Sequence, residues 1–458
     1  MTSTTDRAPL VVGIDLATAE ARVAVADGTG QVVARGSAPL APPRRPGPGE
    51  SEQDAGSWWP AVAGALRGAL HGLGDRVVAV AVSSTSGTAV LADGEYRPIG
   101  PALLYDDARA PAPERWDWLL ARAGARRVAQ HAWHASDLVV AHLTGSAPAT
   151  DWSHALKTGY DPEARRWGPA GPAAALRPEV RAPASAAGTV CAAAAGATGL
   201  PTGCSVRLGM TDGCAAQLAA GADRPGRFVS VLGTTLVVKG ASEGRLDAPE
   251  AGVYSHRHPG GWWLPGGASN TGGGSLASRF ARSSWADLDR RAAARGPATT
   301  VCYPLPGVGD RFPFAAAGAR ELWSAPPADE VDAYRAVLEG VAFVERLAYE
   351  RLADLGAPLG GPLRSAGAGG RSAIWTAVRA TVLDVAIVGS ATAETSFGAC
   401  ILAAAGTLHA SLDAAGDAMV APAGIPVAPV AAERAQLDDS YGRFVAALDE
   451  QGWLPWRR

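Results

Sequence analysis

The chain has 458 residues, enough for two or three domains that each bury a core of their own. Its formal charge of -3 creates no strong field for nucleic acid or an anionic membrane, so we expect a small-molecule ligand. Five scattered cysteines without a C-x-x-C pair indicate neither a disulfide framework nor a zinc site, and the absence of an apolar signal core or membrane-spanning stretch predicts a cytoplasmic protein.

Strands and helices alternate in the first part of the chain. Residues 10–28 predict strand, tight turn and strand, because β-branched residues flank a short run of small and polar ones. Residues 57–74 have helical spacing, with Ser57 as a candidate cap, and residues 76–94 predict two further strands. This alternation favours α/β layers.

The pattern restarts in the second part. Residues 226–240 again predict strand, turn and strand, and they follow a Gly- and Pro-containing linker at 221–226. Residues 331–356 contain the longest helical pattern, and residues 363–389 predict strand, glycine turn, helix and strand. We therefore expect two lobes of similar design. By composition, two proline-rich segments are predicted to be loops: 39–50 and 417–431.

Four turns are rich in glycine and hydroxyl groups: 15–20, 232–236, 266–274 and 367–372. Glycine lets the backbone approach a ligand closely, and consecutive N–H groups in such turns cradle phosphate oxygens. Together the turns suggest a nucleotide, although each alone is more often only a turn. None is a Walker loop, and none pairs G-x-G-x-x-G with a preceding strand and a later acid.

Single residues keep plainer interpretations open. Asp15 at a strand end also fits a hydrogen bond to a neighbouring turn, and Asp212 in "GMTDGC" fits a helix cap as well as a catalytic acid. His256 and His258 suggest metal ligands, but no clear third ligand accompanies them, which favours a solvated loop. Ser86 lacks a G-x-S-x-G elbow, which argues against a hydrolase.

An ordered set of motifs, each weak alone, runs through nearly the whole chain: "GIDLATAEAR", "GESEQDAGSWWPAV", "LLYDDARA", "HLTG", "ATGLPTGCSVRLGMTDGCAAQLAAG", "SVLGTTLVV", "GGASNTGGG", "GAGGRSAIW" and "ETSFGACILAAAG". In this order they resemble the FGGY family of carbohydrate kinases. The segments "SSTSGTAVL", "LLYDDA", "HALKTGYDP" and "GVYSHRHPGGWWLPGGASN" are most similar to its D-ribulose kinase-like branch.

The resemblance implies an α/β, actin-like fold of the ribonuclease H type, with two similar lobes around a central cleft. Residues 1–222 would form the sugar and metal lobe, and residues 223–458 the nucleotide lobe. It implies ATP and Mg²⁺ as cofactors, a sugar substrate, no nucleic acid or membrane partner, and a monomer or homodimer. The implied activity converts D-ribulose to D-ribulose 5-phosphate. A kinase of D-xylulose or another pentulose or polyol stays open, as does an impaired ATP or sugar sensor.

The resemblance also implies roles for single residues. Asp212 would be the general base that deprotonates the sugar hydroxyl, and Asp15 would hold Mg²⁺ directly or through water. The implied nucleotide-binding residues are Thr18, Gly233, Thr234, Gly267, Thr271, Gly369, Ser372 and Trp375. The implied sugar-side residues are Ser86, Tyr105, Asp107 and Arg109. Two plainer readings remain: Arg109 only braces Asp107, and Trp375 is a core residue.

The chain departs from the family pattern in two places. Ala17 stands where the family's D-x-G-T motif has glycine, and a positive φ there would strain alanine by about 1 kcal/mol. The segment from 116 to 145 is shorter than in the family and lacks an extra sugar-side helix, which would open the sugar pocket. These departures motivate the sensor alternative, whereas the presence of both Asp15 and Asp212 argues for catalysis.

Overall fold

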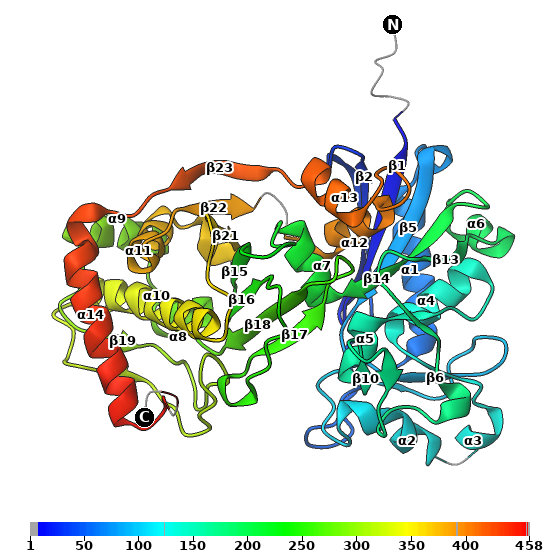
Figure 1. The fold of residues 1–458 in the computed structure, drawn as a ribbon, viewed down its shortest axis with the longest axis horizontal. Helices are drawn as coiled ribbons and strands as arrows, with labels where there is room; N and C mark the ends of the chain where they lie inside the picture. Colours follow the sequence, from blue (N-terminus) through cyan, green and yellow to red (C-terminus); the bar gives the residue numbers. More distant parts are fainter. Residues whose placement is uncertain (1–7, 123, 391–392, 455, 457–458) are drawn as a thin grey trace, which may run out of the picture. The chain divides into compact units, whose positions relative to one another are not determined.

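A computed structural model describes residues 8–122, 124–390, 393–454 and 456. The chain forms two compact units (Figure 1). Unit 1 consists of Met1–Ala219, His256–Gly260 and Ala393–Ala421, and unit 2 consists of Ala220–Ser255, Gly261–Thr392 and Pro422–Arg458. Unit 1 therefore includes two segments from the second half of the chain.

A six-stranded sheet forms the centre of unit 1, in the order β13-β14-β5-β1-β2-β3. Its strands are β1 (Leu10–Leu16), β2 (Glu20–Asp27), β3 (Val32–Pro39), β5 (Val77–Ser84), β13 (Ala186–Thr189) and β14 (Ser205–Thr211). β1, β2 and β3 form an antiparallel meander, whereas β5 and β14 run parallel to β1. The predicted strand, turn and strand over 10–28 is confirmed.

Nine α-helices of unit 1 lie within the described residues: α1 (Trp58–Ala69), α2 (Arg115–Leu120), α3 (Ala125–Val128), α4 (Ala135–Thr144), α5 (Trp152–Lys157), α6 (Ala192–Thr198), α7 (Asp212–Ala219), α12 (Thr395–Ala404) and α13 (Leu412–Met419). The predicted helix over 57–74 is confirmed as α1, although it ends before Gly72, whose φ is +73°. Four two-stranded ribbons complete the unit: β4 (Glu52–Gln53) with β7 (Ala102–Leu103), β6 (Val90–Ala92) with β8 (His131–Trp133), β9 (Thr150–Asp151) with β12 (Val180–Arg181), and β10 (Tyr160–Asp161) with β11 (Arg166–Trp167).

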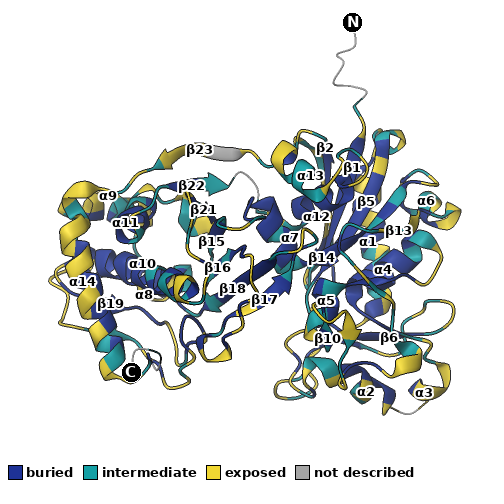
Figure 2. Ribbon diagram, in the orientation of Figure 1, coloured by how far each residue is buried: buried dark blue, intermediate teal, exposed yellow. Residues whose placement is uncertain are grey.

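The central strand β1 is buried along its whole length (Figure 2). Its alternate side chains Val12 and Ile14 join a core with residues of α1 and α4. On the opposite face, a Cβ at Gly13 would lie 1.9 Å from the carbonyl oxygen of Ser396. Glycine at this position therefore allows α12 to pack directly on the strand.

Unit 2 contains a seven-stranded sheet in the order β17-β18-β16-β15-β21-β22-β23. Its strands are β15 (Phe228–Leu232), β16 (Leu236–Gly240), β17 (Tyr254–Arg257), β18 (Trp263–Ser269), β21 (Leu363–Ala366), β22 (Ile387–Ser390) and β23 (Pro422–Val427). β18, β16 and β15 form an antiparallel meander, and β21 and β22 continue parallel to β15. The strands β18-β16-β15-β21-β22 have the same order and the same parallel or antiparallel pairing as β3-β2-β1-β5-β14 of unit 1. The predicted internal repeat and the ribonuclease H-like class are therefore confirmed.

The α-helices of unit 2 in the described part of the chain are α8 (Gly273–Arg279), α9 (Trp285–Arg295), α10 (Glu330–Asp354), α11 (Ala373–Leu383) and α14 (Ala431–Glu450). A short ribbon joins β19 (Cys302–Tyr303) to β20 (Leu322–Trp323). The longest predicted helix is confirmed as α10, which ends near Gly356 with a φ of +102°. α10 is largely buried (Figure 2). The predicted strand, turn, helix and strand over 363–389 is confirmed as β21, α11 and β22.

The prediction of a loop over 417–431 is wrong. Its first residues end α13, and Pro422–Val427 form β23, which pairs antiparallel with β22. β23 is an edge strand, and an edge tolerates proline because one side of the strand donates no ladder hydrogen bonds. Composition alone did not distinguish such a strand from a loop.

The structure also bears on the membrane and the cysteines. Among the described residues, no helix combines the length and the apolar character needed to cross a bilayer. All five cysteines are free thiols, and four of them are buried.

Candidate active site

Two acids of unit 1 lie at the same edge of its sheet. Asp15 at the end of β1 pairs in register with Ser83 of β5, and Thr211 at the end of β14 pairs with Ser84. Asp212 follows as the first residue of α7. The two acids are therefore separated by two strand spacings, about 10 Å. Ligands of α/β sheets bind at the carboxyl ends of parallel strands, which is where both acids lie.

The carboxylate of Asp15 is buried and only half satisfied. Its side chain is 1% exposed, and Arg22 donates to Oδ2 from Nη2 and Nε at 2.6 and 3.0 Å. Its other oxygen, Oδ1, has no hydrogen-bond partner. Burial raises the pKa of Asp15 to about 6, against the lowering effect of Arg22 and with a further increase from the charge of Asp212.

These features fit a magnesium ion. The unpartnered, buried Oδ1 of Asp15 is an acceptor that a hard cation can occupy. No group of three or more His, Cys, Asp or Glu side chains that could hold a metal ion occurs in the part of the chain that the structure describes. Magnesium in phosphoryl-transfer sites needs only one or two protein carboxylates, because substrate phosphates and water supply the other ligands.

The turn after β1 accommodates alanine without strain. Ala17 donates its N–H to the carbonyl oxygen of Glu20 at 3.1 Å, and it is not among the residues with positive φ. Ala17 therefore carries none of the strain that a positive φ would impose on alanine. The neighbouring Thr18 is half-buried, and its carbonyl oxygen accepts a hydrogen bond from Nε2 of Gln53 at 2.9 Å.

Helix α12 holds the start of α7 in place. The hydroxyl of Thr395 donates to the carbonyl oxygen of Asp212 at 3.3 Å. A Cβ at Gly398 would lie 1.9 Å from the carbonyl oxygen of Ala215, so the two helices are in backbone contact there. The side chain of Asp212 accepts the N–H of Gly213 at 2.7 Å and is partly exposed.

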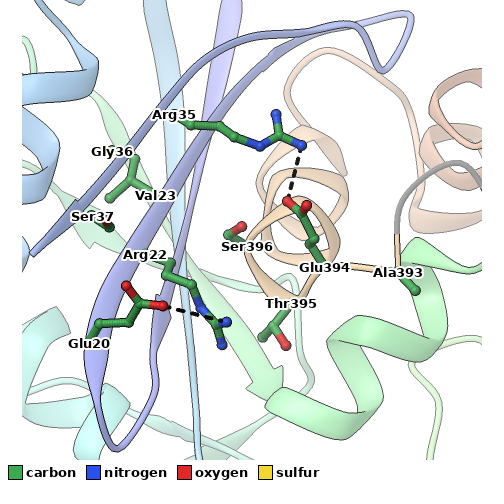
Figure 3. A pocket seen from close by; sticks show the side chains of 10 residues that line it. All are labelled: Glu20, Arg22, Val23, Arg35, Gly36, Ser37, Ala393, Glu394, Thr395 and Ser396. Atoms are coloured by element: carbon green, nitrogen blue, oxygen red, sulfur yellow. Dashed lines mark hydrogen bonds and ion pairs between the residues drawn. The ribbon is translucent and has the colours of Figure 1, made fainter. Parts of the chain in front are cut away.

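A cavity of about 520 Å³ lies beside β2, β3 and the start of α12 (Figure 3). Two arginines line it, each beside a glutamate. Nη1 of Arg22 lies 3.8 Å from Oε1 of Glu20, and Nη2 of Arg35 donates to Oε2 of Glu394 at 3.1 Å. Sequence reasoning missed both arginines. The available signal for Arg22 was the predicted hairpin, because Arg22 lies directly opposite Asp15 in the observed register.

The proposed sugar-side residues Asp107 and Arg109 form a braced loop. Oδ2 of Asp107 accepts the N–H of Ser51 at 2.7 Å and Nη2 of Arg109 at 2.7 Å, and Arg109 also donates to Glu52 at 2.9 Å. Burial raises the pKa of Asp107, but hydrogen bonds from Arg109 and Ser51 outweigh burial and lower the pKa overall. The bracing interpretation of Arg109 agrees with this geometry.

The other two sugar-side candidates differ in exposure. The side chain of Tyr105 is 53% exposed. The hydroxyl of Ser86 is buried and has no hydrogen-bond partner. Ser86 therefore offers an unused donor and acceptor near the end of β5, as a site for sugar hydroxyls requires.

A second cavity, of about 280 Å³, lies within unit 2. It brings together five of the residues assigned to the nucleotide: Gly233, Thr234, Gly369, Ser372 and Trp375. The turn after β15 and the start of α8 interlock there, because Gly273 donates its N–H to the carbonyl oxygen of Gly233 at 2.7 Å and Gly274 donates to that of Thr234 at 2.9 Å. Small residues thus line one wall.

Three further residues of this cavity were not identified from the sequence: Trp285, Asp289 and Tyr334. Tyr334 donates its hydroxyl to Oδ1 of Asp289 at 2.7 Å, and Ser372 donates to Oδ2 at 2.9 Å. Trp375 is 2% exposed and donates Nε1–H to the carbonyl oxygen of Leu338 at 3.1 Å. Trp375 is thus both a core residue and a wall of the cavity.

Three assigned nucleotide residues do not line this cavity: Thr18, which belongs to unit 1, Gly267 and Thr271. A Cβ at Gly267 would lie 2.2 Å from the ring of Phe312, so Gly267 faces a packed side chain. Thr271 is fully buried, and its hydroxyl shares a 2.9 Å hydrogen bond with Ser269.

The expectation of a solvated loop at His256 and His258 is wrong. Both histidines are buried, at 2% and 0% exposure, and His256 lies in β17. A single sequence did not reveal this burial, because it depends on packing around the strand.

Two units that each repeat the ribonuclease H-like order define a protein of the actin-like class. The chain belongs to the FGGY family of carbohydrate kinases. The model of the family's N-terminal domain matches residues 10–118, and that of its C-terminal domain matches residues 228–407.

Individual relatives are consistent with this family. The chain is 31% identical to a protein named xylulose kinase from Streptomyces rubiginosus over 300 residues, which span 56% of this chain and 59% of the relative. The xylulose kinase structure from Rhodospirillum rubrum has 25% identity and a TM-score of 0.84, over 96% of this chain and 98% of that one. Plasmodium falciparum glycerol kinase with ADP has a TM-score of 0.82 at 15% identity over 96% and 98%, a likeness of fold alone.

Proposed function

We propose that this protein is an ATP-dependent kinase that phosphorylates the terminal hydroxyl of a ketopentose. The observation that carries the proposal is the pair of acids at the carboxyl ends of β1 and β14, Asp15 and Asp212. Asp15 is buried with an unused oxygen, whereas Asp212 is partly exposed at a helix start. The two environments suit two different roles, a metal-holding carboxylate and a general base.

In the proposed reaction, Asp212 accepts the proton of the terminal sugar hydroxyl. The hydroxyl oxygen then forms a bond to the γ-phosphorus of ATP, the bond from that phosphorus to the bridging β–γ oxygen breaks, and ADP leaves. Bound Mg²⁺, held by Asp15, would neutralise phosphate charge. Arg22 orients the Asp15 carboxylate and supplies a cation beside it. Such reactions depend chiefly on positioning and charge stabilisation.

The cavity of unit 2 is the proposed place for the adenosine. Gly233 and Thr234 suit the phosphate end, because glycine lets a phosphate approach the backbone closely and the Thr234 hydroxyl is a hydrogen-bond donor. Trp375 and Trp285 provide flat apolar surface for a base. For Thr18, Gly267 and Thr271, only the family resemblance supports a role in nucleotide binding.

Two ketopentoses are the leading candidates for the sugar. The names of the relatives favour D-xylulose, whereas motifs such as "HALKTGYDP" and "LLYDDA" resemble the D-ribulose kinase branch. The two sugars differ only in configuration at C3. A few hydrogen bonds decide such a choice.

The proposal is tested by measuring ADP release from ATP with D-xylulose, D-ribulose, pentitols and glycerol, with and without Mg²⁺. We expect sugar-stimulated, Mg²⁺-dependent ADP release with at least one ketopentose and a phosphate ester on its terminal carbon. ATP binding without any sugar-stimulated release would support the sensor alternative instead.

A further inference from the structure

A buried cluster of polar side chains lies at the start of α5. Asp151 and His154 form its centre, at 3% and 0% exposure. Nδ1–H of His154 donates to Oδ2 of Asp151, and the hydroxyl of Ser153 donates to Oδ1. Burial raises the pKa of Asp151 and lowers that of His154, but the attraction between the two groups outweighs burial and shifts each pKa in the other direction.

Two hydrogen-bonded arms extend from the cluster. The first arm, formed by Ser153, reaches β14, the strand that precedes the proposed base Asp212. The N–H of Thr211 donates to the hydroxyl of Ser153 at 3.0 Å. Thr211 is the last residue of β14, and Asp212 follows it directly. Because Ser153 is itself held by Asp151, the peptide before Asp212 has a fixed anchor in the core.

The other arm reaches the end of β5. Nε2 of His154 shares a 3.0 Å hydrogen bond with the hydroxyl of Ser84 and lies 3.2 Å from the Ser84 carbonyl oxygen. Ser84 is the last residue of β5 and leads into the segment that contains Ser86. The cluster thus connects the ends of two neighbouring parallel strands.

We propose that Asp151, Ser153 and His154 are positioning residues for phosphoryl transfer. They fix the proposed base Asp212 and the segment of Ser86 relative to each other, with Asp151 holding both arms. This inference rests on the proposed function. The three residues are buried and act through Thr211 and Ser84, so none of them contacts the substrate.

A second buried pair in the same unit provides a matched comparison. Nδ1 of His134 lies 3.0 Å from Oδ2 of Asp137, and its ring lies 5.7 Å from that of His154. The other partners of His134 are the hydroxyls of Thr150 and Thr158. This pair is equally buried, but its side-chain hydrogen bonds do not reach the ends of β5 or β14.

The first test removes the arm to β14. We expect Ser153→Ala to lower kcat about 3- to 10-fold, the change that loss of one ordinary hydrogen bond produces, while KM for the ketopentose stays constant. The control is Ser136→Ala, which removes a buried hydroxyl that has no hydrogen-bond partner. Equal kcat values for Ser153→Ala, Ser136→Ala and the unaltered protein would overturn the inference.

The second test removes the arm to β5. We expect His154→Asn to raise KM for the ketopentose about 3- to 10-fold, because the hydroxyl of Ser84, which leads into the segment of Ser86, loses a partner. Among the described residues, this hydroxyl then keeps only the N–H of Ser136 as a partner. His134→Asn removes a histidine from the same core and should lower thermal stability without changing KM. An equal change in KM in both variants would assign His154 a merely structural role and refute the proposal.

A third measurement does not depend on catalysis. In Ser153→Ala the amide of Thr211 loses its acceptor, so hydrogen exchange over residues 209–213 should become faster than in Ser136→Ala. Unchanged hydrogen exchange would refute the anchoring of Thr211 by Ser153, even if the protein phosphorylates a sugar. Faster exchange in a protein that phosphorylates no sugar would support the anchor and refute the proposed function, so the two failures can be told apart.

Discussion

Arg22 donates two hydrogen bonds to one oxygen of Asp15 and leaves the other oxygen buried without a partner. The two residues are directly opposite each other on β1 and β2, so the hairpin register itself creates the pair. An acid that is buried and only partly neutralised is poorly suited to stabilising the fold and well suited to holding a cation.

Asp15→Asn should therefore stabilise the fold while abolishing activity. The pKa of Asp15 is about 6 in the folded chain against 3.8 as its ordinary value, so the folded state retains a proton that the unfolded state has lost. The contribution of Asp15 to the stability of the unaltered protein thus falls as pH rises from 3.8 to 6 and is level above. The variant escapes this loss, which is at most about 3 kcal/mol for two pK units.

The measurement is urea unfolding of both proteins between pH 4 and pH 8, in EDTA to exclude divalent cations. We expect the advantage of Asp15→Asn to be absent near pH 4 and largest above pH 6. A constant difference across this range would show that the ionisation of Asp15 does not control it.

Asp212→Asn should fold normally and bind ATP but lose sugar phosphorylation about 10²- to 10⁴-fold, which is the usual contribution of a positioned base. Steady-state kinetics and calorimetric titration with ATP check the two parts. Asp75→Asn, at an exposed acid of the same unit, is the control and should leave both unchanged. Turnover of Asp212→Asn near that of the control would remove Asp212 from the role of base.

Gly398→Ala should separate α12 from α7. The added methyl group would lie 1.9 Å from the carbonyl oxygen of Ala215, so we expect a loss of about 1 to 3 kcal/mol in unfolding free energy and a lower kcat from displacement of Asp212. Gly64→Ala in α1 is the matched control, because nothing lies within 4 Å of its Cβ. This control should gain up to about 1 kcal/mol. Gly398→Ala with unchanged stability and kcat would refute the close contact.

Asp289→Ala should raise KM for ATP about tenfold and leave kcat unchanged, because the hydroxyls of Tyr334 and Ser372 lose the acceptor that orients them in the cavity. Its control is Asp287→Ala on the same helix, where the carboxylate is 43% exposed and pairs with Arg290. An ATP KM that rises equally in both variants would argue against a nucleotide in this cavity.

Local patterns predicted much of the fold. β-Branched runs around small turns predicted β1 with β2 and β15 with β16, and helical spacing predicted α10. Features that depend on long-range packing were not predicted. The burial of His258, the strand at Pro422–Val427 and the cavity wall at Asp289 follow from neighbours distant in sequence.

The candidate site shows the same difference between local sequence patterns and contacts that depend on the fold. The motif of Asp212 stands out in the sequence because small residues surround an acid before a helix. The role of Arg22 required the strand register, and the anchor at Ser153 required a contact to Thr211 from a separate segment. The family resemblance therefore pointed to the proposed reacting groups, whereas the side chains that orient them became apparent only from the structure.

The place of α12 in unit 1 has a consequence for biosynthesis. This helix packs on β1, β5 and β14 and on α7, yet its residues are synthesised long after those of these elements. A nascent chain that stops before Thr395 lacks the partner of Gly13 and of Ala215. Unit 1 therefore cannot complete its folding before α12 has been synthesised. A gene fragment that ends before Thr395 would encode a unit 1 without this helix.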